Sequence, residues 1–184
     1  MKHAAIPEVA ERVRVTILQG EAKASDDPNV EFSTVLGSCV ATCMFDPVAR
    51  IGGMNHFLLA EPPSYADRTT FDDHYGLFLM ELLVNEMFSL GAVKARMKAR
   101  LYGGANLREG MAAIGSVNAA FARKFLRDEG IEMVHEDMEG RNARRVHFLP
   151  ASGQVRCRTT VNTAAPTQQP LAPRKAGSGD VTLF

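Results

Sequence analysis

The sequence predicts an α+β domain built from two helices and about eight short strands. Its 184 residues are enough for one domain with a hydrophobic core but too few for two domains of ordinary size. We place the domain at residues 14–158, after a loosely ordered N-terminus (1–13). From residue 159 to 184, Ala, Pro, Thr, Gln, Gly and Ser dominate, which predicts a disordered tail.

The strands are expected where β-branched and aromatic residues gather between turn residues. A polar segment at 21–29 with a turn at Asp26–Asn29, and a polar loop at 62–73, interrupt them. The segments with strand composition are residues 14–18, 30–35, 40–45, 53–59, 97–102, 131–138, 145–148 and 154–158.

Two segments repeat apolar residues at the spacing of an amphipathic helix. The first follows Asp72 or Asp73 as a cap and ends at Gly91. The second follows Ser116 as a cap and ends at Gly130. The apolar stripes are Leu77, Met80, Leu83, Val84, Met87 and Leu90 in the first, and Val117, Ala120, Phe121 and Phe125 in the second.

Charge and composition exclude several classes of function. The chain carries 21 basic and 21 acidic residues, so its formal net charge is zero, which argues against a nucleic-acid or membrane-surface protein. The N-terminus lacks the apolar core of a signal peptide, and no apolar run approaches the ~20 residues that span a bilayer. We therefore expect a cytoplasmic protein whose three cysteines are free thiols.

The candidate site is a cysteine in a tight Gly-Ser-Cys turn, with a histidine on the next predicted strand. The turn, Gly37-Ser38-Cys39, is called the elbow below, and the histidine is His56. A thiolate attacks amide carbonyls well, and a nearby imidazole that takes the thiol proton forms an ion pair and raises the thiolate fraction. Glycine allows the backbone N–H groups of the elbow to point at an oxyanion.

Two other interpretations of these residues are open. A buried cysteine often serves only as a small apolar side chain. Cys39 and Cys43, with His56 and His74 beyond, also suggest a zinc site. On a strand, however, two residues four apart are separated by roughly 13 Å, which is too far for ligands of one zinc. We therefore expect no metal and no other cofactor.

The chain resembles the CheD family of chemoreceptor glutamine deamidases, in motifs that keep family-like order and spacing across about residues 14–158. Those motifs are Leu36–Ala41, Asp46-Pro47, Gly53–Leu59, Tyr75-Gly76, Met80–Glu86, Tyr102–Asn106, Ile114-Gly115 with Asn118, and Phe148–Gly153. The resemblance implies layered mixed sheets packed with two main helices. It also implies a cysteine-hydrolase fold like that of the deamidase domain of cytotoxic necrotizing factor toxins.

The resemblance also implies the chemistry, which is conversion of receptor glutamines to glutamates. Cys39 takes the position of the nucleophile and His56 that of the base. The family threonine, which orients the imidazole, falls at Ser33 by register, with Thr34 as the alternative. Adjacent strand residues point to opposite faces, so only one of these two hydroxyls can serve.

A protein substrate requires a binding groove beside Cys39. Gly37 and Ser38 are expected near the oxyanion, and Gly103, Gly104 and Asn106 either line the groove or form a structural turn. The expected partners are the cytoplasmic helices of chemoreceptors and, as a second partner, a CheC-type phosphatase. A non-catalytic adaptor of such proteins is the alternative function.

Overall fold

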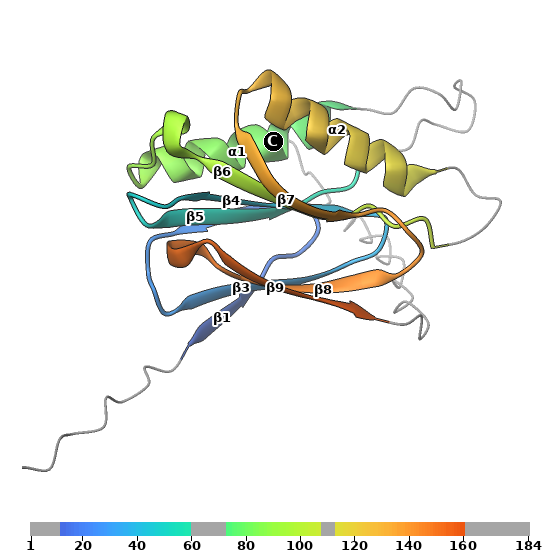
Figure 1. The fold of residues 1–184 in the computed structure, drawn as a ribbon, viewed down its shortest axis with the longest axis horizontal. Coiled ribbons are helices and arrows are strands. Elements are labelled where there is room, and N and C mark those ends of the chain that lie inside the picture. The colour runs from blue at the N-terminus through green and yellow to red at the C-terminus, as the bar shows by residue number, and fades with distance from the viewer. Residues whose placement is uncertain (1–11, 60–72, 108–112, 161–184) are drawn as a thin grey trace, which may run out of the picture.

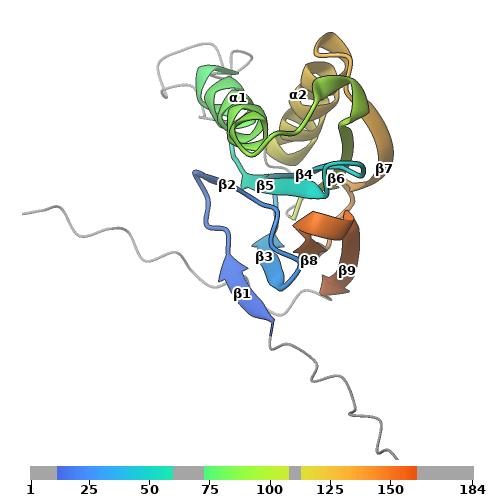
Figure 2. The same ribbon diagram turned by 90° about the vertical axis from the view of Figure 1, so that its left-hand side faces the viewer.

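The computed structural model describes residues 12–59, 73–107 and 113–160. They form three layers, a four-stranded sheet, a five-stranded sheet and a pair of helices (Figure 1). The two sheets lie face to face, and both helices cover the outer face of the five-stranded sheet (Figure 2). This is the α+β architecture of layered mixed sheets and two helices that was expected.

The outer sheet has four strands in the order β1-β3-β8-β9. β1 is parallel to β3, and the other neighbours are antiparallel. The strands are β1 (Val13–Thr16), β3 (Val30–Leu36), β8 (Ala143–Leu149) and β9 (Gln154–Thr160).

The middle sheet has five strands in the order β2-β5-β4-β6-β7. β6 and β7 are parallel, and the rest are antiparallel. Its strands are β2 (Glu21–Ser25), β5 (Ile51–His56), β4 (Val40–Asp46), β6 (Lys98–Gly103) and β7 (Glu132–Met138). Because this sheet is covered on both faces, every residue of β4 and β5 is buried.

The helices are α1 (Asp73–Ser89) and α2 (Ile114–Asp128), with short 3-10 turns at Lys94–Arg96 (η1) and Pro150–Ser152 (η2). α1 covers the β2–β5 side of the middle sheet, and α2 covers the β6–β7 side (Figure 2). Gly91 and Gly130 follow the two helices with positive φ, as expected. Ser116 is not a cap, because α2 already begins at Ile114.

The middle sheet separates two apolar layers, because its side chains alternate between its faces. On β4, Val40 and Met44 join the core under the helices. Cys43 and Phe45 face the other way, into the core between the two sheets. Cys39 packs partly against this inter-sheet core, so the alternation of β4 sets the side on which the thiol lies.

Other sequence-based expectations also differ from the structure. The polar segment 21–29 contains β2, which pairs with β5 as an edge strand. Leu77 and Leu90, placed on the buried stripe of the first helix, are exposed. The tail was expected to begin at residue 159, but β9 continues to Thr160. Residues 1–11, most of the 62–73 loop and residues 161–184 lie outside the described part of the chain.

Candidate active site

The strand register brings Cys39 and His56 to the same face of the middle sheet. Val40 and Phe57 exchange both backbone hydrogen bonds, each 2.9 Å long. Continuing this register places Cys39 opposite Leu58, two residues from His56. Diagonal neighbours of this kind have Cα atoms about 7–8 Å apart, within reach of a long or aromatic side chain such as the His56 ring. Within the described residues, His56 Nε2 has no hydrogen-bond partner, so no hydrogen bond joins it to the Cys39 thiol. The two predicted catalytic residues are therefore neighbours beside the inter-sheet layer.

The His56 ring is held by hydrogen bonds at Nδ1. Thr34 Oγ1 lies 2.9 Å from Nδ1 and donates its proton to the carbonyl oxygen of Ile17, at 2.8 Å. The same carbonyl lies 3.3 Å from Nδ1. Since the carbonyl only accepts and the hydroxyl proton is already used, Nδ1 must be the protonated nitrogen. The lone pair of the neutral ring is therefore on Nε2, where a base for Cys39 is needed.

The hydroxyl on His56 is that of Thr34, and the preference for Ser33 is wrong. On β3, Phe32 and Leu36 face the inter-sheet core, and Thr34 shares their face. Ser33 lies on the opposite face, by the alternation of a strand. The predicted position is one residue away from the observed one, and a shift of one residue on a strand exchanges the two faces of the sheet.

Burial controls the protonation of the pair. Burial raises the pKa of the Cys39 thiol to about 11, and the hydrogen bond from its own backbone N–H offsets only part of this rise. Burial also lowers the pKa of His56, against the smaller opposite effect of its hydrogen bond to the Ile17 carbonyl. Both shifts favour a neutral thiol and a neutral imidazole at pH 7 over the ion pair expected from the sequence.

The backbone of the elbow leaves two donors open. Across the described residues, the N–H groups of Ser38 and Cys39 have no hydrogen-bond acceptor other than the Cys39 sulfur itself. Both residues are half-buried. The Ser38 N–H and the Cys39 N–H, whose only acceptor is the adjacent sulfur, are thus available to stabilise an oxyanion.

Asn118 of α2 connects the two halves of the site. Its Oδ1 accepts a hydrogen bond from the Leu59 N–H (3.0 Å), and its Nδ2 donates to the Ser38 carbonyl (2.8 Å). The side chain is fully buried. One amide thus joins the segment that follows His56 to the residue that precedes Cys39.

Gly103 and Gly104 support the elbow from the other side. Gly104 N–H donates to the Cys39 carbonyl and Ala105 N–H to the Gly37 carbonyl, both at 2.8 Å. Gly103 has φ of +106°, and a Cβ there would lie 2.2 Å from the Cys39 carbonyl oxygen. These contacts are those of a structural turn, one of the two alternatives for this segment.

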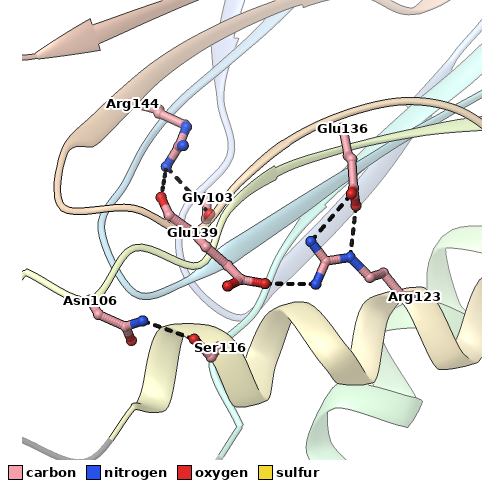
Figure 3. Close-up of polar contacts among 7 residues, drawn as sticks. All are labelled: Gly103, Asn106, Ser116, Arg123, Glu136, Glu139 and Arg144. Carbon is pink, nitrogen blue, oxygen red and sulfur yellow. Dashed lines mark hydrogen bonds and ion pairs between the residues drawn. The ribbon is translucent and has the colours of Figure 1, made fainter.

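Asn106 belongs to the same support. Its Nδ2 donates to Ser116 Oγ at 2.8 Å, which ties the glycine turn to the first turn of α2 (Figure 3). Arg144 donates to the carbonyls of Glu139 and Gly103, at 2.8 and 3.4 Å (Figure 3). Arg123 binds the carboxylates of Glu136 and Glu139, both at 2.7 Å. Charged side chains therefore hold the Gly103-Gly104 turn in place, and this turn holds the elbow through its backbone hydrogen bonds.

Some site residues were missed by the sequence argument. Asn118 was noted only as part of a motif, and the Ile17 carbonyl and Gln19 were not considered. Gln19 lies in the turn between β1 and β2, and its Oε1 is 3.5 Å from Cys39 Sγ. A backbone carbonyl has no sequence signal, and neither side chain is near Cys39 along the chain.

The other cysteines lie apart from this chemistry. Cys43 is on β4, fully buried in the inter-sheet core, in the strand conformation that argued against zinc. Cys157 is on β9, 3.6 Å from an oxygen of Asp137. Within residues 12–59, 73–107 and 113–160, no three His, Cys, Asp or Glu side chains gather as metal ligands would.

Fold and site together define a class of protein, a layered α+β domain with a candidate thiol-hydrolase site between its sheets. A family model described as CheD chemotactic sensory transduction matches residues 58–159. A "Probable chemoreceptor glutamine deamidase CheD" of Zymomonas mobilis is 50% identical, over 93% of this chain and 92% of its own. Its namesake in Caulobacter sp. strain K31 is 46% identical, over 94% and 93%. The chain belongs to the CheD family.

Solved structures resemble the chain loosely. A DUF152-family protein of Neisseria meningitidis gives a TM-score of 0.43 at 15% identity, over 65% of this chain and 53% of its own. The fold likeness to cytotoxic necrotizing factor remains a prediction. Among the described helices, none is both long and apolar enough to cross a bilayer.

Proposed function

We propose that this protein converts glutamine side chains of chemoreceptors to glutamates, with Cys39 as nucleophile and His56 as base. The observation that carries the proposal is the buried His56 ring, which Thr34 and Ile17 fix in the tautomer that leaves Nε2 free. The relatives' name, probable chemoreceptor glutamine deamidase, supplies the substrate class.

The reaction begins with transfer of the thiol proton. His56 Nε2 takes the proton from Cys39 as sulfur attacks the carboxamide carbon of the substrate glutamine. The oxyanion is held by the N–H groups of Ser38 and Cys39. The imidazolium then protonates the leaving nitrogen, and ammonia departs from a thioester. Water, deprotonated by the same ring, hydrolyses the thioester and restores the thiol.

The product changes receptor electrostatics. Each conversion replaces a neutral amide by a carboxylate and so adds one negative charge to the receptor surface. Like charges at helical spacing destabilise packing by about 0.2–0.5 kcal/mol per pair. Several such changes are enough to shift a two-state signalling equilibrium.

The site of action in this proposal is the cytoplasm, where Cys39 meets the helical cytoplasmic part of the receptor. A CheC-type phosphatase is the second proposed partner. In the alternative function, an adaptor binds receptor or phosphatase without turnover, and the thiol is then dispensable.

The deciding experiment measures the mass of a receptor cytoplasmic fragment after incubation with the protein. Wild type should make the fragment about 1 Da heavier for each converted glutamine, and Cys39→Ala should not. Cys157→Ala is the matched control, because it removes another half-buried thiol, on β9, two strands away from Thr34, and it should retain activity. If wild type and Cys39→Ala alter receptor signalling equally without a mass change, the adaptor function is correct.

A further inference from the structure

A glutamine of the chain itself lies at the candidate nucleophile. The thiol of Cys39 donates a hydrogen bond to Gln19 Oε1, with sulfur and oxygen 3.5 Å apart. The side chain of Gln19 ends in a primary carboxamide, the functional group that the proposed reaction attacks. The thiol of the free protein therefore already contacts the chemical group of its substrate.

The backbone around Gln19 is held by the strands of the site. Ile17 N–H donates to the Ser33 carbonyl (2.9 Å), and Gly20 N–H donates to the His56 carbonyl (2.8 Å). Gly20 has φ of +88°, a conformation that suits glycine and turns the chain sharply into β2. The turn that places Gln19 beside Cys39 is thus hydrogen-bonded to β3 on one side and to β5 on the other.

The side chain of Gln19, by contrast, is weakly held. Gln19 is exposed, and within the described residues its contact with sulfur is its one side-chain hydrogen bond. A thiol is a weak hydrogen-bond donor, so this contact holds the carboxamide only weakly. An incoming group can therefore displace this carboxamide without moving the backbone.

Beside the thiol, a polar group of the site has no hydrogen-bond partner among the described residues. His56 is 7% exposed, and within the described residues its buried Nε2 has no hydrogen-bond partner. Gln19 engages the thiol through oxygen and gives nothing to this nitrogen. A substrate carboxamide has an NH₂ group that can reach Nε2 while its oxygen meets the N–H groups of the elbow. A receptor glutamine can therefore satisfy groups that Gln19 leaves unpaired.

We propose that Gln19 is a built-in mimic of the substrate glutamine, which covers Cys39 in the free protein and is displaced by the receptor glutamine. This inference rests on the proposed function. A competitor within the chain reduces the fraction of molecules ready to bind and raises the apparent KM by the inverse of that fraction. For one weak hydrogen bond we expect a factor of about 2–10.

Kinetics of receptor deamidation test the competition. Gln19→Ala and Gln19→Met, which keeps the length but lacks the amide, should lower KM by about 2–10-fold with kcat unchanged. Gln154→Ala, an exposed glutamine on β9, is the control and should behave as wild type. A fall in kcat would instead make Gln19 part of the catalytic machinery, and an unchanged KM would remove any role for it. Either result overturns the proposal.

Alkylation of Cys39 by iodoacetamide tests, without any receptor, whether Gln19 covers the thiol. Gln19→Ala should be alkylated faster than wild type by a similar factor, measured by intact mass in a Cys157→Ala background. An unchanged rate overturns the proposal. Faster alkylation in a protein that never deamidates the receptor fragment means that the proposed function has failed, and mimicry with it.

The chemical state of position 19 is the last check. The amide oxygen, not its carbon, faces the sulfur, so Gln19 competes without reacting. Peptide mass analysis of purified wild-type protein should therefore find glutamine at position 19. Glutamate there in wild type, but not in Cys39→Ala, would show a self-substrate and overturn the competitor role.

Discussion

At the scale of single residues, the tautomer of His56 depends on the Ile17 carbonyl and on the hydroxyl proton of Thr34. The Ile17 carbonyl accepts from Thr34 and lies near Nδ1 of His56, so the hydroxyl of Thr34 has its proton committed. The ring must then donate from Nδ1 and keep Nε2 as its base. In the proposed mechanism, a hydroxyl and a backbone carbonyl take the place that a carboxylate has in a catalytic triad, without adding a charge.

Removing the Thr34 hydroxyl should show whether Thr34 or Ser33 is the third residue of the site. Thr34→Val keeps shape but frees the imidazole, so kcat should fall by about one to two orders of magnitude. Stability should fall by only about 1 kcal/mol, because one buried carbonyl loses a donor. Ser33→Ala is the control and should leave kcat within about twofold of wild type. Equal effects of both variants on the deamidation rate would contradict the assignment of Thr34.

The protonation of Cys39 makes a second prediction at this scale. Burial raises the pKa of its thiol to about 11, so the thiolate is scarce at pH 7. The rate of alkylation by iodoacetamide should rise steadily from pH 7 to 10 without reaching a plateau. A plateau near neutral pH would show a thiolate-imidazolium pair instead.

Deamidation should have a different pH profile from alkylation. It needs neutral His56, and burial lowers the pKa of this ring below its ordinary value near 6.5. The rate should therefore be level near pH 7 and fall only in more acidic solution, where the ring becomes protonated. A rate that is already falling between pH 8 and 7 would contradict a lowered His56 pKa.

At the scale of elements, β4, β5 and α2 position the site together. β4 and β5 pair in the register that sets Cys39 diagonal to His56. α2 supplies Asn118, which bonds the backbone on both sides of this pair. The helix therefore contributes geometry to the site without contributing a reacting group.

Asn118 should act as a positioning residue. Asn118→Ala leaves the Ser38 carbonyl and Leu59 N–H unpaired, which should cost about 1–3 kcal/mol in unfolding free energy. The kcat for deamidation should also fall, measured well below the melting temperature, with KM changed less. Asn118→Asp retains the acceptor for Leu59 and loses the donor for Ser38, so it isolates the elbow contact.

The control for Asn118 is Asn85→Ala, an exposed asparagine on α1 that should change neither stability nor rate. If Asn118→Ala lowers stability but leaves the kcat of folded protein intact, Asn118 is structural only.

At the scale of the whole molecule, Asp46 links the sheet to the segment that follows α1. Its fully buried carboxylate binds Arg96 at 2.8 Å and accepts from the N–H groups of Val48, Ala49 and Val93. Burial raises the pKa of Asp46, but Arg96 and these N–H groups outweigh it, and the net pKa is well below the ordinary range. The contact fixes the β4–β5 turn, at the end of these strands opposite the site.

This carboxylate should give stability that acid removes. The unfolded-state pKa of aspartate is near 4, and the folded value is lower. The contribution is therefore present above about pH 4 and is lost as pH falls toward the folded pKa. Asp46→Asn should lower the unfolding free energy at pH 7 by about 2 kcal/mol and flatten its decline below pH 4.

Urea unfolding from pH 2.5 to 7 measures this effect. Asp128→Asn, which breaks an exposed pair with Lys124, is the control and should stay within about 0.5 kcal/mol of wild type. If both variants follow the wild-type pH curve, the Asp46 contact does not stabilise the fold.

Local pattern was enough to predict the class of fold and most of its elements. Helical spacing located both helices, and the glycines at 91 and 130 ended them. β2 was missed, because a short polar edge strand has the composition of a loop and is defined only by its pairing with β5. Leu77 was placed on the buried face of α1 but is exposed. Periodicity shows which face of a helix is apolar, but it does not show how far the neighbouring elements extend over that face.

By itself, the sequence determined that the chain has a cysteine in a glycine-bearing elbow, a histidine one strand later, and motifs of the CheD family. It favoured Ser33 over Thr34 as the third residue, because the sequence does not show which face of β3 meets the middle sheet. The tertiary structure decided this choice, and it also brought Asn118, the Ile17 carbonyl and Gln19 to Cys39 and His56. The physical reason is that hydrogen bonds act over about 3 Å in space, whereas the chain separates these groups by up to 80 residues.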